Sequence, residues 1–124
     1  MKKQKKGFSF IELIVVVTII AVLSVAGVVT YSAVNRKSRD SRRISDLEKM
    51  RMALEMIRQV GVTYPSASSV LAPTYLQAIP KDPVSGNNYI YAQTNSGYGY
   101  TINAILEDPS SSGTGSTAYQ VSNP

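Results

Sequence analysis

Residues 7–34 read GFSFIELIVVVTIIAVLSVAGVVTYSAV, a stretch in which Glu12 is the only charged residue and no proline occurs. As a helix rising about 1.5 Å per residue, the part from Phe8 to Val34 would span roughly 40 Å, which exceeds the hydrocarbon core of a bilayer. Its β-branched residues have modest helix propensity in water, but in lipid the backbone must satisfy its own hydrogen bonds. The stretch therefore predicts a membrane-spanning helix.

Basic residues flank this apolar stretch on both sides. The chain has 13 basic and 8 acidic residues and a formal net charge of +5. Nucleic-acid-binding proteins spread such charge over a folded surface, whereas here it marks the two ends of a membrane-length segment. The flanking residues are four lysines before the stretch and five basic residues after it (Lys2, Lys3, Lys5, Lys6; Arg36, Lys37, Arg39, Arg42, Arg43).

The composition excludes several kinds of chemistry. The chain contains neither cysteine nor histidine, which excludes disulfides, thiolate nucleophiles, Cys/His zinc sites and imidazole bases. A length of 124 residues leaves room for one small domain beside the membrane helix. A multidomain enzyme is therefore excluded, together with most metal and nucleophile chemistry.

An apolar stripe continues the helix beyond the second basic cluster. No proline interrupts residues 8–60 and Gly61 is the first stop signal, so the sequence predicts one helix of about 80 Å from Phe8 to Val60. Its apolar residues recur at steps of three or four (Ile44, Leu47, Met50, Leu54, Ile57, Val60). Opposite charges at i,i+3 spacing are expected on the solvated side (Asp40 with Arg43, Glu48 with Arg51, Glu55 with Arg58).

Residues 61–124 predict a small, turn-rich head. All six prolines of the chain fall here, and we expect short helical turns in 68–79 and a compact double turn in 80–86. Residues 88–93 and 98–107 predict a β-hairpin, and 118–121 a final edge strand, which gives an α+β fold. One face of the second hairpin strand should pack on the helical stripe (Tyr98, Tyr100, Ile102, Ala104, Leu106).

The start of the chain carries the most specific pattern. A lysine-rich leader is followed by Gly7, by Phe8 and, four residues further on, by Glu12 inside an apolar run. This pattern resembles the class III signal of type IV prepilins and type II secretion pseudopilins. The resemblance implies that a prepilin peptidase cleaves after Gly7 and N-methylates Phe8, and that the mature subunits polymerise into a thin helical filament.

The head also resembles the body of major pseudopilins. The similar segments are Tyr75-Leu76, Ile79-Pro80-Lys81-Asp82-Pro83, Tyr89-Ile90-Tyr91 and Tyr98-Gly99-Tyr100-Thr101. The resemblance implies a pilin-like α+β fold with four parts: a cleaved leader (1–7), a transmembrane and filament-core helix (8–34), its amphipathic continuation (35–60) and the head (61–124). Many pilins carry a proline in the membrane helix or a C-terminal disulfide, and this chain has neither.

Glu12 is expected to act in assembly. An ionised carboxylate in a membrane helix costs about 2.5 to 3.5 kcal/mol or more unless it is paired. Cleavage after Gly7 would create a cation one helical turn away, the α-amine of Phe8, which could pair with Glu12 of the same or a neighbouring subunit. Pairing between subunits would set their axial stagger, so cleavage would switch on assembly.

The family resemblance also implies partners and a location. The partners would be other copies of the chain or minor pilins, prepilin peptidase, an inner-membrane assembly platform and, before assembly, the lipid bilayer. The chain would cross the bacterial cytoplasmic membrane once, with the head outside, and would then enter an extracellular or periplasmic filament. A loop at Glu107 and Asp108 is similar to a calcium loop of major pseudopilins. Two adjacent carboxylates supply few of the six to eight oxygens that calcium takes, although Asn103 and the turn at Asp82 could add ligands. We therefore expect no cofactor, with calcium at this loop as the alternative.

Two other classes of protein fit parts of the sequence. Ser24-Val25-Ala26 offers the small residues that a signal peptidase requires, which would release a secreted binding module. The basic cluster at 36–43 would suit a membrane-anchored DNA-uptake receptor. DNA binding, however, needs basic residues across a folded surface, usually with interleaved aromatic residues, and here they flank the apolar stretch. The sequence leaves open whether a filament would serve motility, adhesion, DNA uptake or protein secretion.

Overall fold

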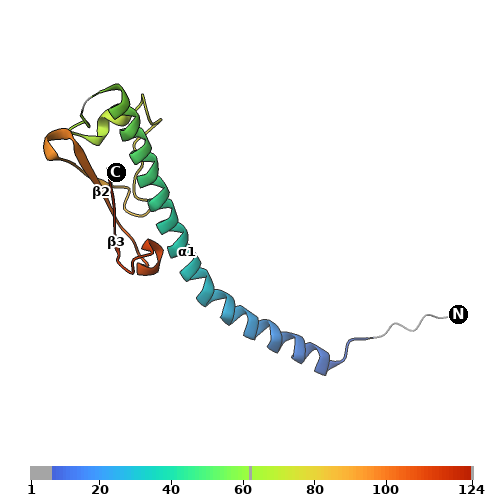
Figure 1. Ribbon diagram of the computed structural model, residues 1–124. Helices are drawn as coiled ribbons and strands as arrows, with labels where there is room; N and C mark the ends of the chain where they lie inside the picture. Colours follow the sequence, from blue (N-terminus) through green and yellow to red (C-terminus); the bar gives the residue numbers. More distant parts are fainter. Residues whose placement is uncertain (1–6, 62, 124) are drawn as a thin grey trace. The chain divides into compact units, whose positions relative to one another are not determined.

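The computed structural model describes residues 7–61 and 63–123, so the lysines of the predicted leader lie outside the described residues. Figure 1 shows one long helix, α1 (Phe10–Val60), and a small antiparallel sheet of β1 (Ile90–Thr94), β2 (Gly99–Ile105) and β3 (Ala118–Ser122). The described connections contain two short 3₁₀ turns (Ser68–Leu71, Pro109–Ser112) and, between β1 and β2, a tight turn at Asn95–Gly97. The predicted pilin-like α+β class is confirmed. The helix begins two residues later than predicted and ends at the predicted residue.

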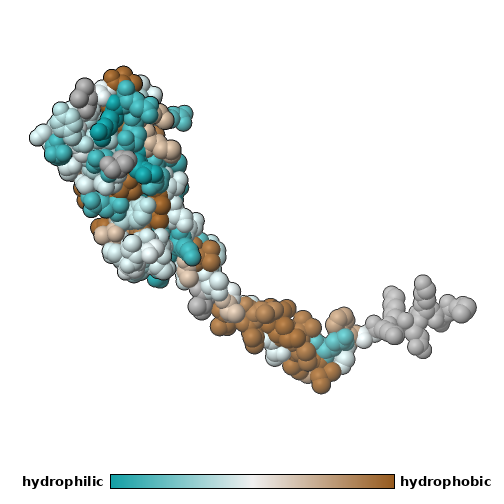
Figure 2. Space-filling view, viewed as in Figure 1, coloured by the Kyte–Doolittle hydropathy of each residue, from teal (hydrophilic) through white to brown (hydrophobic). Residues whose placement is uncertain are grey.

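The chain divides into two units, Met1–Asn35 and Arg36–Pro124. In the first unit the large apolar side chains of α1 are exposed, and Figure 2 shows them as an almost unbroken brown surface. Within the described residues α1 is long and apolar enough to cross a membrane. Three hydroxyls in this part donate to carbonyls of the preceding turn (Thr18 to Val15, Ser24 to Ile20, Thr30 to Ala26). Hydrocarbon requires such internal pairing of polar groups.

The second unit has its core between α1 and one face of the sheet. The strands lie in the order β1-β2-β3, with Tyr91 of β1 opposite Ile102 of β2. Leu54 of α1 and Tyr100 and Ile102 of β2 are fully buried in one cluster. The prediction that the helical stripe packs on alternate residues of the second hairpin strand is confirmed for most members (Leu47, Met50, Leu54; Tyr100, Ile102, Ala104, Leu106).

Two residues of the predicted apolar faces are exposed instead. Val60 is 83% exposed, because three residues fall about 60° short of a helical turn and two such steps carry it about 120° from Leu54. Tyr98 is 51% exposed, because it precedes β2 and has helical backbone angles (φ −90°, ψ −3°) that break the strand alternation. The predictions for these two side chains are wrong.

The hairpin turn lies where the sequence predicts it. Asn95 and Ser96 both have positive φ, at 49° and 53°, a conformation that asparagine tolerates better than most residues. Gly97 follows at φ 94°, and its carbonyl accepts the Tyr64 N–H at 2.8 Å. A Cβ on Gly97 would lie 3.1 Å from the Thr63 Cβ. The glycine therefore lets the hairpin approach the segment that follows α1.

Candidate functional site

The candidate assembly residue lies in the first turn of α1. Glu12 is the acidic residue of that turn, and the Ser9 N–H donates to its Oε2 at 3.4 Å. The Ser9 carbonyl accepts the Leu13 N–H at 3.2 Å, which makes Ser9 the residue that caps the helix. This is half of a capping box, in which an acidic side chain three residues past the cap binds the cap N–H. This role of Ser9 was not predicted, although Ser-x-x-Glu is the sequence signature of a capping box.

The candidate processing bond lies just outside the helix. Gly7, Phe8 and Ser9 have no helical or strand structure. Phe8 is 80% exposed, and apart from the chain neighbours of Gly7 no described atom lies within 4 Å of where a Cβ on Gly7 would stand. Because Glu12 reaches back to Ser9, its carboxylate is directed toward the end of the helix at which a new amine on Phe8 would appear. The structure thus brings the three predicted site residues to one end of α1.

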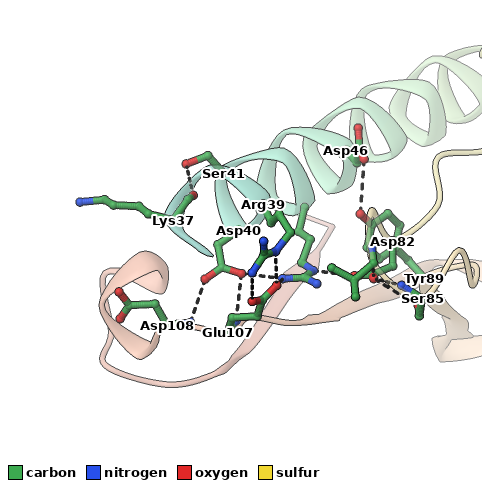
Figure 3. A network of polar contacts seen from close by, with 12 residues as sticks. Lys37, Arg39, Asp40, Ser41, Asp46, Asp82, Ser85, Tyr89, Glu107 and Asp108 are labelled. Atoms are coloured by element: carbon green, nitrogen blue, oxygen red, sulfur yellow. Dashed lines mark hydrogen bonds and ion pairs between the residues drawn. The ribbon is translucent and has the colours of Figure 1, made fainter. Parts of the chain in front are cut away.

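A polar network in the second unit joins α1 to two loops (Figure 3). Its centre is Arg43, whose side chain is only 5% exposed. Arg43 donates to Asp40 of α1 at 2.7 Å, to Asp82 of the turn before β1 at 2.5 Å, and to Glu107 after β2 at 2.9 Å. Arg39 also donates to Glu107, at 2.7 Å through Nε. One helix face therefore holds both loops through charged hydrogen bonds.

Asp40 and Asp82 also order the backbone of the two loops. Asp40 accepts the N–H groups of Glu107 at 2.9 Å and of Asp108 at 2.8 Å, one on each oxygen. The second oxygen of Asp82 accepts the N–H groups of Val84 at 3.0 Å and of Ser85 at 2.8 Å. Each carboxylate thus bonds a loop backbone as well as Arg43, which is how buried charge is tolerated.

The expectation that Asp40 and Arg43 face solvent is wrong. Both are buried, because Arg43 precedes Leu47, Met50 and Leu54 by four, seven and eleven residues and therefore lies on the core face of the helix. The apolar stripe, extended backward by one turn, would have located it. The pair itself is present at the predicted spacing, as is the Glu48–Arg51 pair at 2.8 Å.

Glu55 and Arg58, which were predicted to pair directly, are instead connected through the hydroxyl of Tyr64. Arg58 donates to the Tyr64 hydroxyl at 3.0 Å, and that hydroxyl in turn donates to Glu55 at 3.0 Å. Tyr100 donates to the same carboxylate at 3.1 Å, and the rings of Tyr64 and Tyr100 meet edge to face at 4.7 Å. Glu55 therefore satisfies two buried tyrosine hydroxyls.

The network lowers the pKa of its carboxyl groups. Hydrogen bonds from Arg39, then from Arg43, lower the pKa of Glu107 to about 2. The Arg43 guanidinium likewise holds the pKa of Asp82 well below its usual range. Burial alone would raise the pKa of Asp40, but the N–H donors of Glu107 and Asp108 outweigh it and the net shift is downward. All three groups are therefore charged at neutral pH.

Acid is expected to destabilise the second unit. A carboxyl group whose folded pKa is lowered adds stability that is present above its unfolded pKa, about 4 to 4.5, and is lost as the pH falls through the folded value. The melting temperature, followed by tyrosine circular dichroism, should be constant from about pH 8 to pH 5 and fall steadily toward pH 2. In Glu107→Gln the fall should be smaller. An equal fall in that variant would contradict a contribution from Glu107.

The loop considered for calcium has other partners. The Glu107 carboxylate is bound by Arg39 and Arg43, and Asp108 Oδ1 accepts the Ser110 N–H at 2.9 Å and caps the turn Pro109–Ser112. Among the described residues, no group of three or more acidic, histidine or cysteine side chains is arranged to hold a metal ion. The charged partners of this loop are therefore arginines.

Comparison with known proteins agrees with the prediction made from the start of the chain. Residues 2–28 match the family described as the prokaryotic N-terminal methylation motif, and this segment contains Gly7, Phe8 and Glu12. Over 109 residues the chain is 29% identical to type II secretion system core protein G of Vibrio cholerae, a match that covers 73% of this chain and 74% of that protein. The two findings support the family of type IV prepilins and type II secretion pseudopilins, as the sequence predicts.

Proposed function

We propose that the chain is a structural subunit of a type IV pilus-like or secretion-pseudopilus filament, cleaved after Gly7 and polymerised through its N-terminal helix. The observation that carries this proposal is the position of Glu12. It is the only charged residue in the apolar part of α1, and its carboxylate reaches back toward the end of the helix at which cleavage would expose an amine. The motif match over residues 2–28 supports the same processing.

The exposed apolar surface of the first unit suits a helix that lies in lipid before assembly and in the filament core afterwards. Helices in lipid associate by close packing and not by a hydrophobic driving force between them, so small residues at their contacts matter. Ala21, Ser24, Ala26 and Gly27 supply such positions. Apart from its chain neighbours and the adjacent backbone of the helix itself, no described atom lies within 4 Å of a Cβ built on Gly27. The space beside Gly27 is thus available to a neighbouring helix.

The partners and location follow from this proposal. Before assembly the chain would lie in the cytoplasmic membrane with its head outside, where prepilin peptidase and an inner-membrane assembly platform act on it. Afterwards it would lie in a periplasmic or extracellular filament beside other copies or minor pilins. In this role the chain is a building block and not an enzyme.

The ion pairs of the second unit argue against the DNA-uptake alternative. Two of the five basic residues that follow the apolar stretch, Arg39 and Arg43, are bonded to carboxylates. This leaves Arg36, Lys37 and Arg42 as the exposed members. Three neighbouring charges are few for the phosphate contacts that give DNA-binding proteins their affinity.

Intact mass of the purified protein tests the processing step. The mature chain should lack residues 1–7 and carry one methyl group on Phe8, and Gly7→Leu should accumulate at full length because the added side chain blocks the peptidase. Gly27→Leu serves as a control that should be cleaved normally. A mature chain that begins at Gly27 would support the secreted alternative and contradict the proposal.

Electron microscopy of sheared cell-surface material tests the assembly step. Long fibres labelled by an antibody to the head would identify a major pilin. Short fibres would indicate a secretion pseudopilin. Processed protein that never appears in any fibre would contradict a structural role.

A further inference from the structure

We propose that Arg43 is a built-in structural cation, which holds the turn at Asp82 and the segment after β2 on α1 so that the second unit needs no bound metal ion. Three carboxylates from three separate parts of the chain converge on its guanidinium, at 2.7, 2.5 and 2.9 Å. Carboxylates gathered from separate loops are the ligands that hard divalent cations commonly bind in proteins. Here a side chain of the protein occupies that position.

The shape of arginine suits this role. Its Nη1 donates to Asp40 and Glu107 while its Nε donates to Asp82, so one planar group connects the helix with both loops. A lysine would offer a compact point charge without the fork of donors. The side chain is almost fully enclosed, which strengthens its charged hydrogen bonds and makes an unpaired carboxylate there costly.

The backbone contacts show what Arg43 positions. The Glu107 and Asp108 N–H groups donate to Asp40, and the Val84 and Ser85 N–H groups donate to Asp82. Each of these carboxylates is oriented by Arg43, so the guanidinium acts on two loop backbones through them. Without it, the carboxylates of Asp40, Asp82 and Glu107 would face one another. Of the arginines among the described residues, Arg39 alone would still be bonded to these three carboxylates, through Glu107.

The first arm of the test needs only the native full-length chain in detergent micelles. Its melting temperature should be the same in millimolar CaCl₂, in MgCl₂ and in EGTA at matched ionic strength. A melting temperature that rises with calcium or falls with EGTA would show that a metal ion stabilises this unit, and it would overturn the proposal.

The second arm compares Arg43→Ala with Arg42→Ala. Arg42 is exposed on the same helix and has no ion pair among the described residues. Arg43→Ala should lower the melting temperature by about 10 °C or more, Arg43→Lys by less, and Arg42→Ala by under about 4 °C. Equal effects of Arg43→Ala and Arg42→Ala would overturn the proposal.

Hydrogen exchange provides a local measurement that a general loss of packing would not reproduce. In Arg43→Lys, which keeps the charge and therefore the fold, the amides of Glu107, Asp108, Val84 and Ser85 should exchange about tenfold faster or more. The Ile102 amide in β2 should keep its protection. Uniform acceleration, or none at the four loop amides, would contradict a positioning role for Arg43. None of these outcomes depends on cleavage after Gly7 or on filament formation.

Discussion

Replacing Glu12 by valine is expected to remove the chain from filaments while leaving it in the membrane. Glu12 is the only charged residue of the apolar part of α1, so its carboxylate opposes burial in lipid, a cost that reaches about 2.5 to 3.5 kcal/mol for a charge at the bilayer centre. Glu12→Val should therefore insert at least as well as the native chain. It should also still be cleaved, because the bond after Gly7 lies outside the helix, in exposed chain.

The expected loss arises at assembly. In the uncut chain the Glu12 carboxylate accepts the Ser9 N–H at 3.4 Å, a long contact and the one hydrogen bond to this carboxylate among the described residues 7–61 and 63–123. A new amine on Phe8 of a neighbouring subunit would be a far stronger partner in a low-dielectric filament core. Valine offers no partner to that amine, so processed subunits should accumulate in the membrane and be depleted at least about tenfold in sheared filaments.

Controls separate charge from packing in this experiment. Ile11→Val changes the neighbouring side chain by one methylene and should assemble normally. Glu12→Asp keeps the charge with a shorter reach and should give an intermediate filament yield, whereas Glu12→Gln keeps the shape without the charge and should behave like valine. Glu12→Val subunits in filaments at normal yield would contradict the electrostatic account, and helix packing alone would then set the register.

The elements of the fold were predictable because their signals are local and periodic. Steps of three and four placed Leu47, Met50 and Leu54 on one helix face, and strict alternation placed Tyr100 and Ile102 on one strand face. The hairpin turn was marked by Asn95-Ser96-Gly97, residues that accept positive φ. Each of these inferences needs only the conformation of one short segment.

The polar network was not predictable in the same way. Charge at Asp40 and Arg43 suggests a solvated helix face. Their burial is tolerated because Asp82 and Glu107, from distant parts of the chain, pair with Arg43. Pairs separated by 39 and 64 residues leave no periodic trace in the sequence. The candidate site at the N-terminus was accessible to sequence reasoning because Gly7, Phe8 and Glu12 lie within one short segment.

Leu54→Ala is expected to unfold much of the second unit. Leu54 is fully buried in the cluster that α1 and β2 share, beside Tyr100 and Ile102. Removing a buried leucine side chain costs about 2 to 5 kcal/mol, since the lost transfer free energy is joined by the cost of a cavity. Small domains without disulfides have a free energy of unfolding of about 3 to 5 kcal/mol, so the cost of one such cavity is comparable to the whole of that free energy.

The helix itself supplies a matched control for this prediction. Met52 lies two residues before Leu54 and is 53% exposed, so Met52→Ala removes a side chain of similar size without opening a cavity. Melting followed by tyrosine circular dichroism should show a fall of about 10 °C or more for Leu54→Ala and under about 4 °C for Met52→Ala. The far-ultraviolet helix signal should fall less than the tyrosine signal, because the apolar part of α1 keeps its hydrogen bonds in the micelle. Equal melting temperatures for the two variants would mean that the stripe through Leu54 does not hold the sheet on the helix.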